Sequence, residues 1–312
     1  MYLVCGEALF DFFSENAPGN QRSKINYKAI AGGSPFNVAV GLRRLGIDVA
    51  LLAGLSTDYL GRRLQQVLQE EGVRLDYLQD FDAPTTLAMV AVGADGSPHY
   101  SFRGEGCADR LLLLGHLPVL GDEVRGLHIG SFSLVVQPIA DTLLALVRRE
   151  SGKRLISLDP NVRLNPEPNI QLWRERIGAL VEHADLIKVS DEDLSLLHPE
   201  RDPQSVIEGW LEHRCQLVFL TRGSQGATVF SRHHGTWSVP ARAVVMVDTV
   251  GAGDTFQAAL IAWLTEQQLD SVEGLQRLSR EQIEAMLSFA IGAAALTCGK
   301  TGPDLPFRHQ LA

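Results

Sequence analysis

Short apolar runs and amphipathic stretches alternate along most of the sequence. Runs rich in leucine and β-branched residues predict buried strands at 49–53, 155–158, 186–189, 217–220 and 243–247. Apolar residues at helical spacing predict helices at 36–45, at 61–71 and from residue 256 onward. This alternation is typical of α/β layers around a mostly parallel sheet.

Two segments depart from this alternation. Residues 13–31 are polar and irregular, with a turn at Pro18-Gly19-Asn20. Residues 85–103 are typical of a β-hairpin, with strands at 86–92 and 99–103 around a turn at Ala94-Asp95-Gly96. We interpret both as a small β-layer inserted into a core of residues 1–12, 32–84 and 104–312. Such inserts often form lids over a site, and a surface hairpin without a role is the alternative.

Composition excludes several classes of protein. The 312 residues are 45% hydrophobic and 21% charged, and the net charge of -9 without a basic stripe argues against nucleic-acid binding. The four cysteines lie far apart and form no Cys-x-x-Cys pair, which indicates thiols in a reducing compartment. Glu7 and Asp11 interrupt the first apolar run, which therefore does not resemble a signal peptide. No apolar run is long enough to cross a bilayer, and we expect a cytoplasmic protein without membrane contact.

The densest candidate chemistry follows the predicted strand at 243–247, in the string Asp248-Thr249-Val250-Gly251-Ala252-Gly253-Asp254. Glycines at a strand-to-helix junction let another molecule approach the backbone, and the free N–H groups of the new helix attract anions. A carboxylate in the first helical turn can accept a proton. This combination suits phosphoryl transfer to a hydroxyl group, with Asp254 as the base. A glycine-rich turn with Asp254 as a helix cap is the plainer interpretation.

Two further positions carry polar groups that suit a polyol. Residues 6–11 are predicted to form a first strand that ends in the carboxylate of Asp11, and ligands of open α/β sheets bind beyond such strand ends. Gly32-Gly33-Ser34-Pro35 forms a turn before Asn37, whose amide both donates and accepts hydrogen bonds. A solvated strand-end Asp11 and a helix-capping Asn37 are the alternatives.

Two of these strings resemble the signatures of the ribokinase (pfkB) family of carbohydrate kinases. Residues 31–46 resemble the first signature and residues 248–256 the second, and weaker likenesses extend the resemblance from Gly6 to Pro306. The resemblance implies a three-layer α/β/α ribokinase-like domain with a mostly parallel central sheet and a small β-sheet lid. It implies Asp254 as catalytic base, with Gly251, Ala252 and Gly253 around the transferred phosphoryl group. It places sugar binding on Asp11, Gly32, Gly33 and Asn37.

Weaker likenesses imply the nucleotide and cation sites. Ser190 and Asp193 stand where the family has an Asn-x-x-Glu segment that organises Mg²⁺ and the nucleotide phosphates, and Asp193 is shorter than Glu by a methylene. The family's nucleotide loop resembles residues 221–226, which implies ATP contacts from Thr221, Gly223, Gly226 and also Gly253. Arg163 follows a strand near the phosphate acceptor, although a surface Arg in a turn is the alternative. A potassium site is implied at Asp248, Val250, Thr297, Lys300 and Gly302.

One motif points to a different nucleotide site. Gly299-Lys300-Thr301 satisfies a relaxed P-loop pattern, which requires a preceding strand and a following helix. Residues 289–296 are instead typical of a helix, and Pro303 and Pro306 oppose a helix afterwards. We therefore reject the P-loop interpretation.

The sequence is best interpreted as an ATP-dependent sugar kinase that phosphorylates a primary hydroxyl of D-fructose. Phe102 and Arg103 in the hairpin are expected to close over the sugar. A 2-keto-3-deoxygluconate kinase is the first alternative, because Arg103 and Arg163 could pair with a substrate carboxylate. Ribokinase and nucleoside kinase activities are the third choice. A sugar-sensing binding protein would not need Asp254, and no Gly-x-Gly-x-x-Gly follows a strand as in an oxidoreductase. The segments 13–31 and 85–103 are expected to pair with a second copy and form a homodimer.

Overall fold

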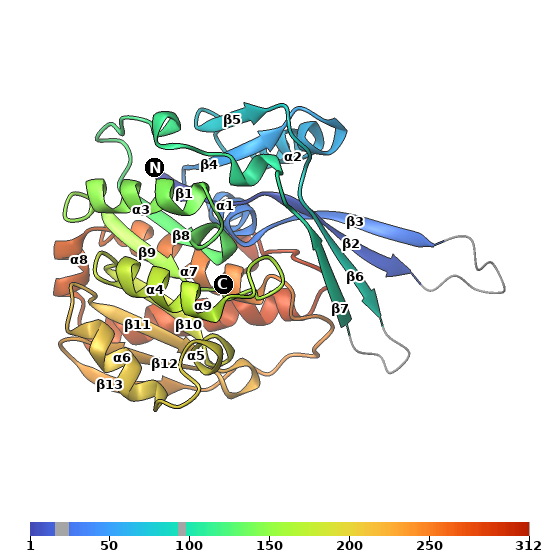
Figure 1. Ribbon diagram of the computed structural model, residues 1–312. Coiled ribbons are helices and arrows are strands. Elements are labelled where there is room, and N and C mark those ends of the chain that lie inside the picture. The colour runs from blue at the N-terminus through green and yellow to red at the C-terminus, as the bar shows by residue number, and fades with distance from the viewer. Residues whose placement is uncertain (16–24, 93–97, 312) are drawn as a thin grey trace.

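A nine-stranded sheet forms the centre of the computed structural model, which describes residues 1–15, 25–92 and 98–311 (Figure 1). Its order is β13-β12-β11-β10-β9-β8-β1-β4-β5, and every neighbouring pair is parallel except at the edge formed by β12 and β13. The strands are β1 Tyr2–Cys5, β4 Val49–Ser56, β5 Leu78–Phe81, β8 Gly126–Gly130, β9 Leu155–Asp159, β10 Leu186–Ser190, β11 Leu217–Thr221, β12 Ala227–Ser231 and β13 Gly235–Val239.

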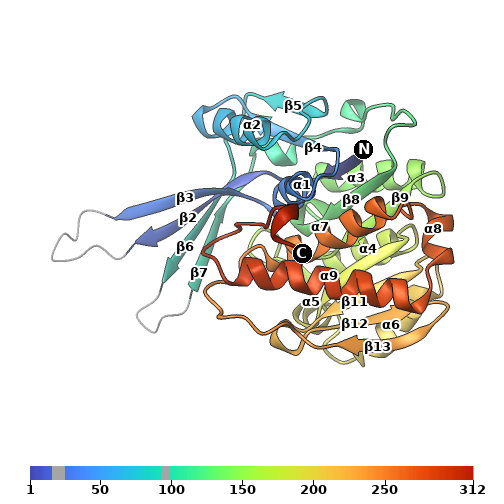
Figure 2. The same ribbon diagram turned by 180° about the vertical axis from the view of Figure 1, so that it is seen from behind.

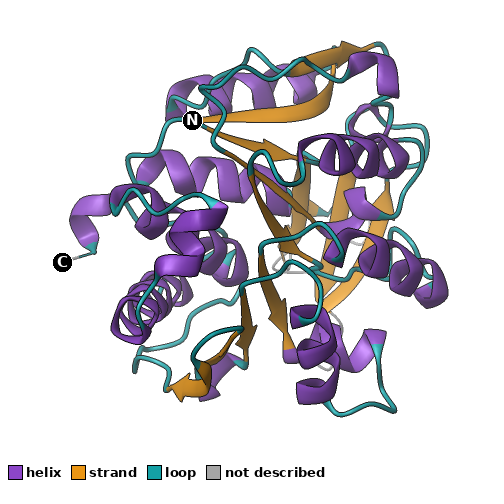
Figure 3. Ribbon diagram, turned by 90° about the vertical axis from the view of Figure 1, so that its left-hand side faces the viewer, coloured by secondary structure: helices purple, strands orange, loops and turns teal. Residues whose placement is uncertain are grey.

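Helices cover both faces of this sheet (Figures 2 and 3). One face carries α1 Ser34–Arg44, α2 Tyr59–Glu71, α7 Ala252–Glu266, α8 Val272–Arg277 and α9 Arg280–Cys298. The other carries α3 Ile139–Glu150, α4 Ile170–Val181, α5 Asp191–Leu197 and α6 Pro203–Leu211. Short 3₁₀ turns lie at Ala108–Arg110, Ser131–Leu134, Leu114–His116, Gly223–Gln225 and Arg308–Gln310.

The strands of the large sheet are buried on both sides. In β1, Tyr2 and Val4 pack against the helices of one face, whereas Leu3 and Cys5 pack against those of the other. All four side chains are buried, as the continuous apolar runs predict for parallel strands between two helical layers. The α/β/α expectation is therefore confirmed.

A second sheet of four strands projects from the body (Figure 1). Its order is β3-β2-β6-β7, and the strands are β2 Leu9–Glu15, β3 Asn26–Gly32, β6 Leu87–Val92 and β7 Pro98–Arg103. The pair β6–β7 matches the predicted hairpin. Residues 6–8 carry the chain from β1 of the large sheet to β2 of the second sheet. The chain returns to the body after β3, where α1 begins.

Three expectations about strands were wrong. Residues 243–247 form no strand but an exposed connection to α7; Val245 is 86% exposed, and Val247 donates its N–H to the Cys298 carbonyl at the end of α9. Residues 13–31 are not irregular throughout, because β2 and β3 pair antiparallel across Glu15 and Asn26. No single strand runs from Gly6 to Asp11, because the chain changes sheets there. The turns expected at 18–20 and 94–96 lie outside the described residues.

The expectations for the core strands and for residues 299–301 are confirmed. The strand predictions at 49–53, 155–158, 186–189 and 217–220 fall within β4, β9, β10 and β11. Gly299-Lys300-Thr301 follows the helix α9 and precedes a loop, so it is not a P-loop. Cys5, Cys107 and Cys215 are buried free thiols, and Cys298 is partly buried. Within the described ranges, no helix is long and apolar enough to cross a membrane.

Candidate active site

The site centres on the carboxylate of Asp254 in the first turn of α7. Gly251 caps this helix with a φ of 79°, a backbone conformation that favours glycine. Asp254 accepts hydrogen bonds from Ser34 Oγ at 2.6 Å and from Asn37 Nδ2 at 2.8 Å, one on each carboxylate oxygen. Both donors lie on α1, so the packing of α1 against α7 fixes the carboxylate.

The start of α7 also offers backbone donors. Ala252 donates its N–H to the Thr249 carbonyl at 3.2 Å, and Thr255 donates to the Gly251 carbonyl at 2.8 Å. The N–H groups of Gly253 and Asp254 lie in the first turn, where a helix provides no acceptor. The dipole of the helix adds positive potential at this end. The arrangement is suited to an anion that approaches the glycines.

Burial raises the pKa of Asp254. The hydrogen bonds from Ser34 and Asn37 oppose this shift because they stabilise the ionised form, and the positive charges of Lys188 and Arg163 oppose it further. A carboxylate with a raised pKa is a better proton acceptor than a solvent-exposed one.

Asp11 belongs to the same site, although it lies within β2 and not at the end of a core strand. It faces Ile30 of β3 across the strand pair. A Cβ atom on Gly32 would lie 2.5 Å from the Asp11 carboxylate, so a side chain at position 32 would displace that carboxylate. Burial and the charge of Asp254 raise the pKa of Asp11 to about 7, and Arg163 opposes the shift.

Gly33 and Asn37 form the start of α1. Gly33 has a φ of 103° and its carbonyl accepts the N–H of Asn37 at 2.8 Å. A Cβ atom on Gly33 would lie 2.9 Å from the Glu7 carbonyl oxygen. The turn therefore brings α1 close to residues 6–8, and Asn37 reaches Asp254 from this helix.

The two predicted lid residues differ in their surroundings. The Phe102 ring packs edge-on against Phe132 of the core, with ring centroids 6.0 Å apart. Arg103 ends β7 with an exposed side chain. The structure thus anchors Phe102 at the base of the second sheet and leaves Arg103 open to solvent.

The residues predicted to contact the nucleotide gather at the ends of β10 and β11. Ser190 and Asp193 form a capping box at the start of α5, in which Asp193 accepts from Ser190 N at 3.1 Å and Ser190 Oγ at 2.6 Å. The other Asp193 oxygen accepts from Val162 N at 2.7 Å. Thr221 lies opposite Ser190, and Gly223 and Gly226 both have positive φ in the turn that follows.

The five residues predicted to hold potassium are brought together. Asp248 accepts from Val250 N at 3.1 Å and from Gly302 N at 2.8 Å, and Lys300 N donates to the Thr297 carbonyl at 3.0 Å. The Thr297 hydroxyl lies 2.8 Å from that of Thr255 on α7. Within the described part of the chain, no group of three or more His, Cys, Asp or Glu side chains could hold a metal ion. A cation here would depend on backbone carbonyls.

Two residues near Asp254 were missed by the sequence analysis as site residues. Ser34 was noted only as part of a turn. Lys188 is 4% exposed and forms an ion pair with Asp159, with Nζ 2.9 Å from Oδ2. The available signal was a lysine inside the apolar run Leu186-Ile187-Lys188-Val189, because a buried strand holds a charged residue only when it is paired.

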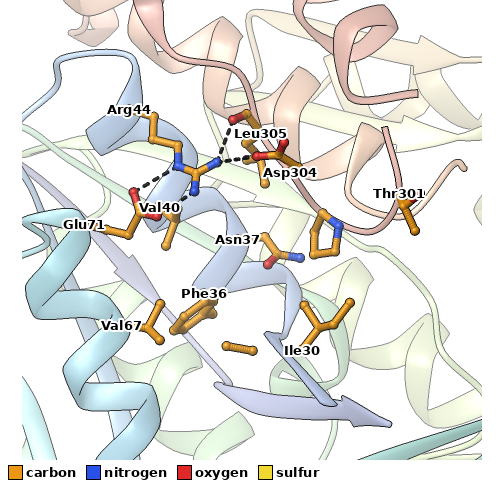
Figure 4. A pocket seen from close by; sticks show the side chains of 12 residues that line it. Ile30, Phe36, Asn37, Val40, Arg44, Val67, Glu71, Thr301, Asp304 and Leu305 are labelled. Atoms are coloured by element: carbon orange, nitrogen blue, oxygen red, sulfur yellow. Dashed lines mark hydrogen bonds and ion pairs between the residues drawn. The ribbon is translucent and has the colours of Figure 1, made fainter. Parts of the chain in front are cut away.

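A pocket of about 230 Å³ is lined in part by Asn37 of this site (Figure 4). The C-terminal segment closes one side of this pocket. Arg44 of α1 fixes that segment through Asp304 Oδ1 at 3.0 Å and the Leu305 carbonyl at 2.8 Å, and it pairs with Glu71 of α2.

Residues 2–310 match the pfkB family of carbohydrate kinases. The chain belongs to this family. A fructokinase of Rhizobium leguminosarum bv. trifolii is 36% identical over 279 residues, which cover 88% of this chain and 84% of that protein. Fructokinase-2 of Solanum habrochaites is 33% identical over 310 residues, which cover 96% of this chain and 92% of that protein.

Solved structures of fructokinases share the fold. A fructokinase from Xylella fastidiosa with bound ATP has a TM-score of 0.90 at 28% identity, over 99% of this chain and 96% of that chain. A fructokinase double mutant from Vibrio cholerae O395, in its fructose, ADP and potassium ion bound form, has a TM-score of 0.82 at 27% identity, over 100% and 97% of the two chains.

The shared charges of the site predict how Asp11 titrates. We expect its pKa near 7 in the ligand-free protein, above the ordinary value of about 3.9. Asp254→Asn should lower this pKa by removing a negative charge, and Arg163→Gln should raise it by removing a positive one. Carboxyl ¹³C NMR titration of the three proteins measures both shifts. An Asp11 that titrates near 4 in all three would contradict the shared site.

Proposed function

We propose that this pfkB-family kinase transfers the γ-phosphoryl group of ATP to a primary hydroxyl of D-fructose. The observation that carries the proposal is the buried Asp254 carboxylate at the N-terminus of α7, held by Ser34 and Asn37. The similarity to fructokinases along nearly the whole chain supports the acceptor.

The site residues divide the work of the transfer. Asp11, Asn37 and the backbone at Gly32 and Gly33 hold the sugar hydroxyls. Asp254 accepts the hydroxyl proton while the hydroxyl oxygen attacks the γ-phosphorus, the bond to the β–γ bridging oxygen breaks, and ADP leaves. The N–H groups at the start of α7, next to Gly251, Ala252 and Gly253, stabilise the charge on the phosphoryl oxygens. Arg163 adds a positive charge near both carboxylates.

The carboxylates of Asp159 and Asp193 suit a Mg²⁺ ion bound with the nucleotide phosphates. Asp159 Oδ1 is buried without a hydrogen-bond partner, and Asp193 lies close enough for its charge to act on Asp159. Both oxygens of Asp193 already accept hydrogen bonds from the protein, so Asp193 would contact the ion through water. Mg²⁺ is commonly held by one or two carboxylates, water and phosphates. When bound, it would offset the triphosphate charge, and residues 221–226 would contact the nucleotide.

Loss of the base tests the proposed reaction. Asp254→Asn should lower kcat by about 10²–10⁴, because general-base catalysis is typically worth this factor, and should leave ATP and sugar binding nearly unchanged. A coupled assay of ADP release and calorimetric binding measure the two effects. A variant that keeps more than about a tenth of the activity contradicts the role of Asp254. Binding of a sugar without ATP consumption by the wild-type protein would instead favour a sensor.

The cation requirement is a separate prediction. Removing Mg²⁺ with EDTA should stop turnover, and K⁺ should stimulate it by binding next to Asp248 and Gly302, which are joined by a hydrogen bond. Rates in K⁺, Na⁺ and tetramethylammonium buffers at equal ionic strength check the second part. Equal rates in all three would remove the potassium site and leave the phosphoryl-transfer mechanism intact.

The acceptor is tested by exchanging the sugar. We expect kcat/KM to be highest for fructose among fructose, 2-keto-3-deoxygluconate, ribose and adenosine. Arg103→Ala should raise KM for fructose only modestly, because Arg103 is exposed and fructose carries no charge for it to pair with. A large loss confined to 2-keto-3-deoxygluconate, with a higher wild-type kcat/KM for that acid, would overturn the choice of fructose.

We also propose that the second sheet joins two copies of the chain. Its edge strands are β3 and β7, and residues Asn26, Tyr27 and Lys28 of β3 are exposed. Open strand edges are commonly covered by association. Light scattering at micromolar concentration should give the mass of a dimer, and Tyr27→Glu should lower it toward that of a monomer. A wild-type monomer would contradict this assembly.

A further inference from the structure

A buried ammonium group lies against the first turn of α7. Lys188 is in the middle of β10 with 4% of its surface exposed, and its Nζ pairs with Asp159 of the neighbouring strand β9. A Cβ atom on Gly253 would lie 3.0 Å from this Nζ. The ammonium therefore lies where a side chain at position 253 would crowd it, next to the first turn of α7.

The position of Lys188 is not explained by pairing alone. An ammonium group is costly to bury, and Asp159 compensates with only one oxygen while its other oxygen has no partner. An ion pair that merely joined β9 and β10 could be replaced by apolar side chains. Lys188 instead extends to the helix that carries Asp254, and its charge acts on Asp159, Asp193 and Asp254 together.

The charges around Asp254 come from several elements. Asp11 of β2 and Arg163 after β9 interact with its charge, and so do Lys188 of β10 and Asp159 of β9. Burial and the negative charges of Asp11 and Asp159 favour the protonated form of Asp254. Ser34, Asn37, Lys188 and Arg163 favour the carboxylate, and among these Lys188 is the buried cation.

We propose that Lys188 is a positioning residue for phosphoryl transfer, whose ammonium group lies against Gly253 and sets the balance of charge around Asp254 in the first turn of α7. The proposal rests on the proposed role of Asp254 as the base. A cation behind the glycine turn also adds to the positive potential that the helix presents to the transferred group.

The pH dependence of kcat tests this role. In Lys188→Met the acid limb should move to higher pH by about 1–3 units, because an opposite charge near a carboxylate shifts its pKa by that amount. The rate at neutral pH should fall accordingly and recover as the pH is raised. KM for ATP and fructose should change less. Lys153→Met is the matched control, since Lys153 is exposed on the turn before β9 and its variant should keep the wild-type limb.

A second variant separates positioning from charge balance. Lys188→Met leaves the Asp159 carboxylate buried and unpaired, which could destabilise the fold. Adding Asp159→Asn removes this unpaired charge. We expect this double variant to unfold at nearly the wild-type temperature and to keep an acid limb above that of Asp159→Asn alone, because Lys188 acts on Asp254 directly. Lys188→Arg should shift the limb least.

Two outcomes would overturn the proposal. One is a wild-type acid limb in Lys188→Met. The other is an acid limb of the double variant that lies no higher than that of Asp159→Asn alone, which would show that Lys188 serves only to neutralise Asp159. Failure of the proposed function is distinguishable from both. Asp254→Asn would then remain active at every pH, whatever the Lys188 variants do.

Discussion

A carboxylate buried between two helices is the constraint on which the rest of the structure depends. Asp254 is 8% exposed, and burying its charge is costly unless donors and cations surround it. Ser34 and Asn37 supply the donors from α1, and the first turn of α7 supplies the dipole. The site therefore exists only while α1 and α7 stay in register, although their sequences are far apart.

Small and apolar residues that take no part in the proposed reaction maintain the relative position of α1 and α7. A Cβ atom on Gly41 of α1 would lie 2.4 Å from Leu305 Cδ2 and 3.0 Å from the Cβ of Ala258 on α7. Small residues at 41 and 258 thus let the helices approach closely, and the C-terminal segment fills the remaining space with Leu305. Arg44 holds this segment through Asp304 and the Leu305 carbonyl. The tail of the chain is part of the support of the site.

The sequence predicted the fold where local pattern decides structure. Apolar runs at 155–158, 186–189 and 217–220 are strands because both helical layers bury them. The equally apolar run at 243–247 forms no strand and is exposed. The prediction failed there because composition alone does not show whether a neighbouring strand is available for pairing. The pairing of β2 with β3 was missed for a related reason. Asn26 and Lys28 face solvent on an edge strand, so the segment has the composition of a loop.

The residues of the site were predictable where they belong to a sequence motif whose chemistry can be recognised. Asp254, Asn37 and Asp11 stand in recognisable strings, whereas Lys188 acquires its meaning only from its contact with Gly253 and Asp159. Two carboxylates, Asp11 and Asp254, share one partly dry site and raise each other's proton affinity. The positive charges of Arg163 and Lys188 oppose this increase in proton affinity. Arg163 acts on both carboxylates, and Lys188 acts on Asp254. If sugar hydroxyls donate to Asp11 as proposed, they would stabilise its charge, and acceptor binding would then be coupled to the ionisation of Asp254 through these four charges.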